Sequence, residues 1–183
     1  MNIDKLIGNT PMIKIKFKYQ NRITNVYAKL EYYNYTGSIK DRLANYIIKE
    51  SYKKGMLSEG MPIIEATSGN TGISFSALGA LYGHPVHIFM PDWVSSERIK
   101  IMNLYGANVH LVSREDGGFS EAIKRADDLS MKIGGFRPDQ FNNKLNESEE
   151  FIEEEVYVES KVDFEKTNKI ILHITGEVNK PRD

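Results

Sequence analysis

The sequence contains no cysteine among its 183 residues and only one tryptophan. Without cysteine, the chain can form no disulfide framework, no thiolate zinc site and no cysteine nucleophile. This composition favours a reducing compartment, and we expect the cytoplasm. The first residues also lack a basic segment followed by an apolar run, and no window approaches the ~18 apolar residues of a membrane-spanning helix. We therefore expect a protein that is neither secreted nor embedded in a membrane.

Neither sign of charge predominates, since 24 Lys and Arg residues stand against 25 Asp and Glu residues. The charge is nevertheless uneven along the chain. Residues 147–183 contain 11 acidic and 5 basic side chains, so the preceding residues carry a net charge of +5. This small excess favours anionic small molecules, whereas nucleic-acid binding is typically marked by basic clusters interleaved with aromatic residues. We expect no nucleic-acid partner.

The histidines and serines show none of the spacings that mark a metal or hydrolase site. No carboxylates stand at metal-ligand spacing beside His84, His87, His110 or His173. We interpret these histidines as isolated surface residues or satisfied core residues, and we expect no metal. Ser68 lacks the Gly-x-Ser-x-Gly elbow of an α/β-hydrolase, which disfavours a Ser-His-Asp hydrolase.

The sequence does contain a regular alternation of short apolar runs and amphipathic segments, which predict strands and helices respectively. The expected strands are residues 25–31, 62–66, 86–90 and 108–112, and the expected helices are residues 39–54, 73–82, 95–105 and 119–133. This alternation predicts a doubly wound α/β fold, with a parallel sheet, flanking helices and ligands bound at the carboxyl ends of the strands. Pro91 is expected to break the third strand, and Ile99, Met102 and Leu104 are expected to lie near one side of the next helix.

The loop at 67–72, Thr-Ser-Gly-Asn-Thr-Gly, follows an expected strand. Two glycines allow a tight turn, and three hydroxyls and an amide stand at a helix N-terminus, which outlines an anion cradle. The loop is neither a Walker loop nor Gly-x-Gly-x-x-Gly, so a nucleotide is poorly supported. A carboxylate or a small phosphate fits it better.

Lys40 lies in Gly-Ser-Ile-Lys-Asp-Arg at 37–42, in the first turn of an expected helix. The neighbouring Arg42 and the positive end of the helix dipole both disfavour the ammonium form, so we expect a lowered pKa for Lys40. A neutral amine is what Schiff-base chemistry requires. Lys40 is therefore a candidate catalytic residue.

Eight motifs follow one another in order between residues 5 and 146. They are IGNTP at 7–11, AKLE at 28–31, TGSIKDR at 36–42, EATSGNTG at 65–72, MP at 90–91, ER at 97–98, GA at 106–107 and QF at 140–141. In this order they resemble the fold-type II pyridoxal-phosphate enzymes, specifically the cysteine synthase (O-acetylserine sulfhydrylase) and cystathionine β-synthase family. The resemblance implies a fold similar to that of the tryptophan synthase β subunit.

The resemblance also implies pyridoxal 5'-phosphate as cofactor and β-replacement on O-acetylserine with sulfide, which gives cysteine. Lys40 then forms the Schiff base with the cofactor and moves the α-proton, and Asn70 hydrogen-bonds the ring oxygen of the cofactor. The residues implied to hold the α-carboxylate of the small amino-acid substrate are Thr67, Ser68, Gly69, Asn70 and Thr71. A homodimer is typical of the family.

The chain departs from the family after residue 146. Family members are longer, and their later half carries a glycine- and threonine-rich loop that binds the cofactor phosphate. Here Gly176 is the only glycine after Gly135, so no such loop can be assigned. Tyr35 stands where the family often has proline or another small residue.

We expect three parts in the chain. They are an N-terminal segment with strands at 1–34, a small α/β domain at 35–146 that carries Lys40 and the TSGNTG loop, and an acidic tail of unassigned fold at 147–183 with one further strand at 169–175. Three interpretations stay open. The chain is a truncated relative with little activity, an enzyme half completed by a second chain, or a non-catalytic interaction protein that uses the small domain as a platform.

Overall fold

A computed structural model describes residues 5–19, 22–140 and 142–143. Contacts between Cα atoms divide the chain into two units, with a boundary between Ile39 and Lys40. The predictions for the acidic tail, including the strand at 169–175, lie outside the described residues. Within the described ranges, no helix is long and apolar enough to cross a membrane.

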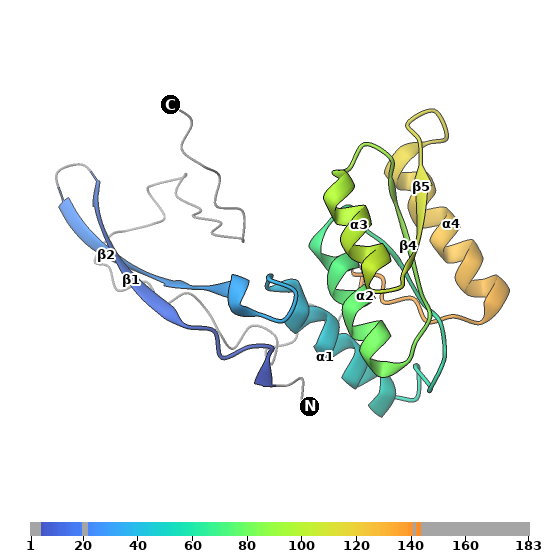
Figure 1. Ribbon diagram of the computed structural model, residues 1–183, viewed down its shortest axis with the longest axis horizontal. Coiled ribbons are helices and arrows are strands. Elements are labelled where there is room, and N and C mark those ends of the chain that lie inside the picture. The colour runs from blue at the N-terminus through green and yellow to red at the C-terminus, as the bar shows by residue number, and fades with distance from the viewer. Residues whose placement is uncertain (1–4, 20–21, 141, 144–183) are drawn as a thin grey trace. The chain divides into compact units, whose positions relative to one another are not determined.

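The N-terminal unit contains an antiparallel pair of strands, β1 (Met12–Tyr19) and β2 (Arg22–Lys29) (Figure 1). The strand expected at 25–31 thus begins and ends earlier than predicted. It ends at Lys29 because the chain turns into a short 3-10 helix, η2 (Glu31–Tyr33). Strand β1 alternates apolar residues with lysines, which is the pattern of a strand with one face turned to water.

The second unit contains a parallel sheet of three strands in the order β3 (Ile63–Ala66), β4 (Val86–Pro91) and β5 (Asn108–Val112). The predicted parallel α/β fold is therefore confirmed. Phe136 forms a further parallel bridge with Ile63, so the chain returns to the free edge of β3 after its last described helix. This return creates a switch in strand order at β3, and ligands of α/β sheets bind at the carboxyl ends of strands at such a switch.

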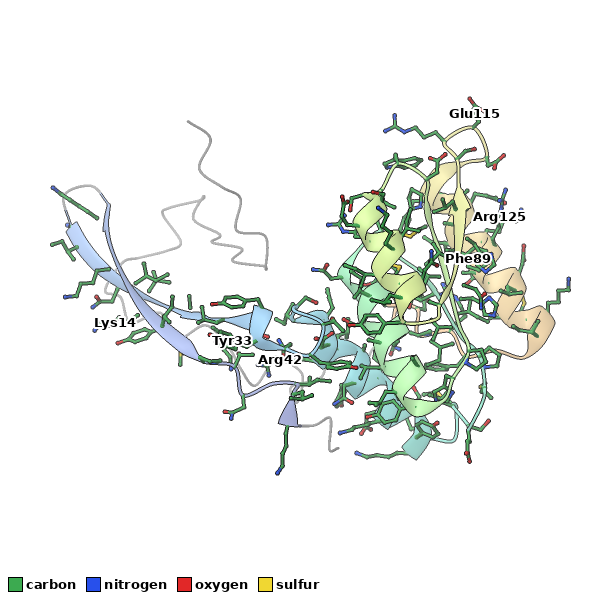
Figure 2. All side chains as sticks on the ribbon, viewed as in Figure 1. Lys14, Tyr33, Arg42, Phe89, Glu115 and Arg125 are labelled. Atoms are coloured by element: carbon green, nitrogen blue, oxygen red, sulfur yellow. The ribbon has the colours of Figure 1, made fainter. Side chains whose placement is uncertain are left out.

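The described part of the chain forms four α-helices: α1 (Lys40–Lys53), α2 (Asn70–Tyr82), α3 (Ser96–Leu104) and α4 (Gly118–Ile133). Helices α2 and α3 lie on one side of the sheet and α4 lies on the other (Figure 1). The core between the sheet and α4 consists of Ile64, Ala66, Phe89, Val112, Ala122 and Ala126. Phe89 of this core is labelled in Figure 2.

Helix α2 begins at Asn70, three residues before the expected start at residue 73. The prediction was wrong because the polar residues at 70 and 71 are of types that are common in loops. The first turn of a helix tolerates such residues, since its N–H groups have no partner within the helix. The TSGNTG segment is therefore a three-residue loop followed by the first turn of α2.

Two further predictions about the third strand and helix were wrong. Pro91 does not break the strand but forms its last residue, where it pairs with Val112 of β5. Leu104 does not share a side with Met102: Leu104 is 83% exposed, whereas Met102 is buried. The reason is helical geometry, since two residues along an α-helix correspond to a rotation of about 200°.

Candidate active site

Helix α2 presents an N-terminus without a side-chain cap directly after strand β3. Its N-cap residue is Gly69, and its first turn contains no acidic residue. The backbone N–H of Gly69 donates to the Thr67 hydroxyl at 3.3 Å, which fixes the turn before the helix. The first N–H groups of an α-helix lack partners within the helix and carry the positive end of its dipole. This end of α2 is therefore suited to an anion such as a carboxylate.

The five residues at 67–71 that the sequence analysis assigns to the substrate carboxylate differ in how far they are buried. Thr67 and Thr71 are buried, Gly69 is half-buried, and Ser68 and Asn70 are exposed. Arg98 of α3 adds a positive charge to the loop. Its guanidinium carbon and Nε lie 3.9 Å from the point where a Cβ on Gly69 would be.

Helices α1 and α2 are bonded to each other, the first turn of α1 to the second turn of α2. The Ser74 hydroxyl in α2 donates to Oδ1 of Asp41 in α1 at 2.6 Å, and both side chains are buried. Further along both helices, the Tyr82 hydroxyl donates to Oδ1 of Asn45 at 3.2 Å. Lys40 is the first residue of α1, so it lies at the same end of the unit as the loop that precedes α2.

Lys40 is half-buried, and this burial lowers the pKa of its amine from the ordinary value. The direction is the one expected from the sequence. Its cause is removal of the amine from water rather than the charge of Arg42. A lowered pKa increases the fraction of neutral amine, which is the form that attacks a carbonyl.

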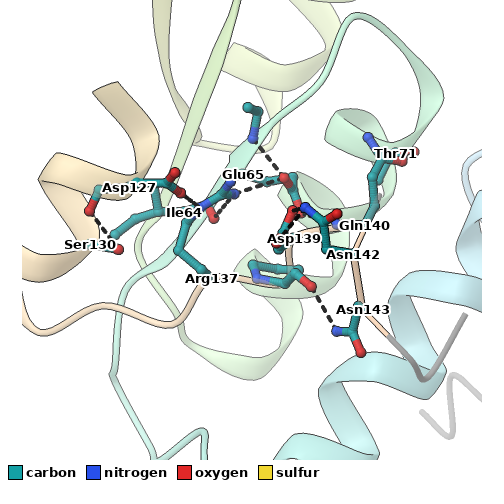
Figure 3. Close-up of polar contacts among 12 residues, drawn as sticks. Ile64, Glu65, Thr71, Asp127, Ser130, Arg137, Asp139, Gln140, Asn142 and Asn143 are labelled. Carbon is teal, nitrogen blue, oxygen red and sulfur yellow. Dashed lines mark hydrogen bonds and ion pairs between the residues drawn. The ribbon is translucent and has the colours of Figure 1, made fainter. Parts of the chain in front are cut away.

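A buried polar network next to the loop was missed by the sequence reasoning (Figure 3). The Thr71 hydroxyl donates to Oε1 of Gln140 at 2.6 Å, and the backbone N–H of Gln140 donates to Oε2 of Glu65 at 3.2 Å. Arg137 forms ion pairs with Glu65 and with Asp127 of α4, each at 2.8 Å. Burial raises the pKa of Glu65, against the opposing charge of Arg137. The available signal was Glu65 itself, a charged residue in an otherwise apolar strand.

The histidines were only partly predicted. His84 is a satisfied core residue as expected, because its Nε2 lies 2.7 Å from the Tyr52 hydroxyl. His87 and His110 are not isolated: Nδ1 of His87 lies 3.1 Å from Nε2 of His110, and their rings stack with centroids 5.4 Å apart. His173 lies outside the described residues. The part of the chain that the structure describes contains no group of three or more side chains that could hold a metal ion.

Comparison with known proteins agrees with this arrangement. The family model described as pyridoxal-phosphate dependent enzyme matches residues 3–159. The chain belongs to this family of pyridoxal-phosphate-dependent enzymes. The resemblance predicted from the ordered motifs is thereby confirmed, and pyridoxal phosphate is the cofactor of the family.

Several relatives within the family are closely similar over the first part of the chain. A cysteine synthase of Staphylococcus aureus (strain Mu50 / ATCC 700699) is 38% identical over 145 residues, which are 79% of this chain and 46% of that protein. The solved structure of a hydrogen sulfide-producing enzyme from Fusobacterium nucleatum matches with a TM-score of 0.76 and 46% identity, over 79% of this chain and 43% of that one. The solved structure of O-Acetyl Serine Sulfhydrylase isoform 3 from Entamoeba histolytica matches with a TM-score of 0.69 and 39% identity, over 79% of this chain and 45% of that one. The chain spans about half the length of the curated relatives it matches.

The described residues fit the reactive end of the family's cofactor. Lys40 offers a partly desolvated amine for its aldehyde, and Asn70, exposed at the start of α2, offers a side-chain amide. The sequence after Gly135 contains one glycine, Gly176, so it offers no glycine-rich loop for the cofactor phosphate.

Proposed function

We propose that this chain supplies the catalytic lysine and the carboxylate-binding loop of a cysteine synthase, which replaces the β-substituent of O-acetylserine with sulfide to give cysteine. One observation carries the proposal. The partly desolvated amine of Lys40 lies at the same end of the unit as the uncapped N-terminus of α2. Similarity to proteins named cysteine synthase and O-acetyl serine sulfhydrylase supports the choice of substrate.

In this proposal each residue has a role that suits its chemistry. Pyridoxal phosphate, when bound, supplies a sink for the electrons of the substrate Cα–H bond. Lys40 holds the cofactor through its amine and, once free, accepts the proton from Cα. Asn70 donates a hydrogen bond to the ring oxygen of the cofactor.

The substrate carboxylate is bound by the loop and first turn at Thr67, Ser68, Gly69, Asn70 and Thr71. Binding there orients the Cα–H bond toward Lys40, and closure of the loop excludes water from the reacting atoms. The positive end of the α2 dipole and the nearby Arg98 guanidinium both favour the carboxylate.

We further propose that the complete activity needs additional polypeptide, either in a homodimer of this chain or from a second chain. This part of the proposal is supported by the composition of residues 136–183, which contain a single glycine, Gly176. The added polypeptide would supply the groups that bind the cofactor phosphate. The alternative is a non-catalytic platform that keeps the family fold.

A cofactor titration tests the proposal. The purified full chain is titrated with pyridoxal phosphate while its visible absorbance is followed, and O-acetylserine is then added. We expect a saturable new band that changes on addition of O-acetylserine. Lys40→Ala should abolish the band because it removes the amine.

Lys124→Ala is the matched control, because Lys124 is exposed on α4 and should keep the band. Absence of a band in the unsubstituted chain would contradict a cofactor site in this chain alone and favour the platform. A band that survives in Lys40→Ala would show that another amine holds the cofactor.

A further inference from the structure

Glu65 is a carboxylate buried at the carboxyl end of β3, with an exposed fraction of 1%. Burying a charge is costly unless the charge is paired and hydrogen-bonded. Both oxygens of Glu65 are satisfied. Oε1 accepts from the backbone N–H of Ala66 at 2.7 Å and from Nη1 of Arg137 at 2.8 Å, and Oε2 accepts from the backbone N–H of Gln140 at 3.2 Å.

The partners of Glu65 come from the segment that returns to the edge of β3 after α4. Arg137 bonds to three residues of two elements, β3 and α4: besides its pair with Glu65, Nη1 donates to the carbonyl of Ile64 at 3.0 Å, and Nε donates to Asp127 of α4 at 2.8 Å. The return segment joins β3 otherwise through the parallel bridge at Phe136. The Glu65–Arg137 pair therefore fixes the chain just beyond that bridge, where Gln140 lies.

Gln140 connects this buried pair to the loop of the proposed site. Its main chain is held by Glu65, and its side-chain Oε1 accepts the hydroxyl hydrogen of Thr71 in the first turn of α2 at 2.6 Å (Figure 3). Because Thr71 is buried, this bond sets the direction of its hydroxyl. A displacement of Gln140 would therefore change the orientation of a residue in the carboxylate-binding loop.

We propose that Glu65, together with Arg137, is a positioning residue that holds Gln140 against Thr71 and so sets the geometry in which residues 67–71 bind a carboxylate. The inference rests on the proposed function, because it assigns a purpose to the same loop. A stabilising role alone accounts poorly for the pair. Replacing a buried ion pair by apolar residues is often neutral or stabilising, so such pairs are weak contributors to stability.

Glu65→Gln separates the bond to Gln140 from the other bonds of Glu65. The amide oxygen of glutamine can still accept from Ala66 and Arg137, but the amide nitrogen then faces the N–H of Gln140, and two donors cannot bond. Glu121→Gln is the matched control. It makes the same change in the partly exposed Glu121–Arg125 pair of α4, which lies outside the network.

Two measurements on the 15N-labelled full chain decide the inference. The first is hydrogen exchange of the backbone amides of Thr71 and Gln140, and the second is a titration with L-serine followed by the amide shifts of residues 69–71. In Glu65→Gln, we expect exchange at Gln140 to be about tenfold faster and L-serine affinity to be about tenfold lower, the loss expected for one hydrogen bond. Because Glu65→Gln removes the charge that faces the buried Arg137, it also lowers the urea midpoint. Exchange at Gln140 is therefore compared with exchange at a core amide such as that of Ile88, which a general loss of stability alone would accelerate by the same factor.

Unchanged exchange at Gln140 together with unchanged affinity in Glu65→Gln would overturn the inference. If the unsubstituted chain binds no L-serine, the carboxylate role of the loop fails, and exchange at Gln140 and Thr71 alone decides whether Glu65 holds them. If Glu65→Gln does not fold, Gln140→Ala takes its place, since it keeps the buried pair and removes the bond to Thr71. Equal L-serine affinity in Gln140→Ala would then refute the inference.

Discussion

Gly72 is a residue at which helix α2 packs closely against the loop before it, helix α3 and strand β4. A Cβ built at this position would lie 2.7 Å from Cγ2 of Thr67, 2.8 Å from Cε of Met102 and 3.3 Å from Cγ2 of Ile88. The first two distances are shorter than real Cβ contacts, so only glycine fits without a shift. Because glycine has no Cβ, the first turn of α2 can pack closely against Thr67 in the loop of the proposed site.

Gly72→Ala should therefore destabilise the chain, although alanine has the higher helix propensity. Overpacking of this kind costs about 1–3 kcal/mol, measured as a lower urea midpoint at unchanged slope. Thr67→Ser removes the methyl group nearest to the added Cβ and keeps the hydroxyl. The double variant should recover part of the loss, and a single variant as stable as the unsubstituted chain would show that α2 can move away from the sheet at no cost.

Helix α3 has nine residues, and one of them is buried. Met102 is its one buried residue, and it lies beneath the first turn of α2 near Gly72. Leu104 is 83% exposed at the end of the same helix. Met102 and Leu104 are close together in the sequence and were therefore predicted to lie on one face. Their angular separation around the helix axis places them on opposite sides of α3.

Met102→Ala and Leu104→Ala form a matched pair that tests this assignment. Truncation of the buried Met102 should lower the free energy of unfolding by about 2–5 kcal/mol, because it leaves a cavity between α3 and α2. Truncation of Leu104 should change it by less than about 0.5 kcal/mol. Chemical denaturation measures both, and a large loss in Leu104→Ala would mean that this residue is covered in solution.

On the scale of the whole molecule, the parallel sheet brings titratable groups from distant parts of the sequence together. Burial lowers the pKa of His87 and of His110, and the neighbouring His87 lowers the pKa of His110 further. The unfolded chain, in which histidine has its ordinary pKa of about 6.5, therefore binds these protons before the folded chain does. Stability is consequently lost as the pH falls from about 6.5 through the lowered pKa values. Glu65 acts in the opposite direction, because its raised pKa lets the folded chain take up a proton before the unfolded chain does.

The pH dependence of unfolding tests the histidine pair. The urea midpoint of the unsubstituted chain should be lower at pH 5.5 than at pH 7.5. The difference between the two values should be smaller in His110→Gln, which removes one titrating group and the repulsion between two charged rings. Lys124→Ala should keep the full difference. An unchanged difference in His110→Gln would contradict the assigned origin of the pH dependence.

The order of strands and helices was readable from the sequence because hydrophobic periodicity is a local property. The strand at residues 108–112 was predicted with its observed bounds, and the helix at 39–54 differs from α1 by one residue at each end. The start of α2 was misplaced because residues 70 and 71 have the composition of a loop but occupy a first helical turn. The pattern could not show whether these residues adopt helical backbone angles.

The sequence by itself also predicted the residues of the candidate site, since Lys40 and the TSGNTG segment stand in ordered motifs typical of one enzyme family. Only the tertiary structure decided what surrounds them. The bond from Asp41 to Ser74 spans 33 positions of the sequence, and the bonds from Arg137 and Gln140 to Glu65 span 72 and 75. Periodicity carries no information over such separations, because these contacts arise when the chain crosses the sheet and returns to the edge of β3.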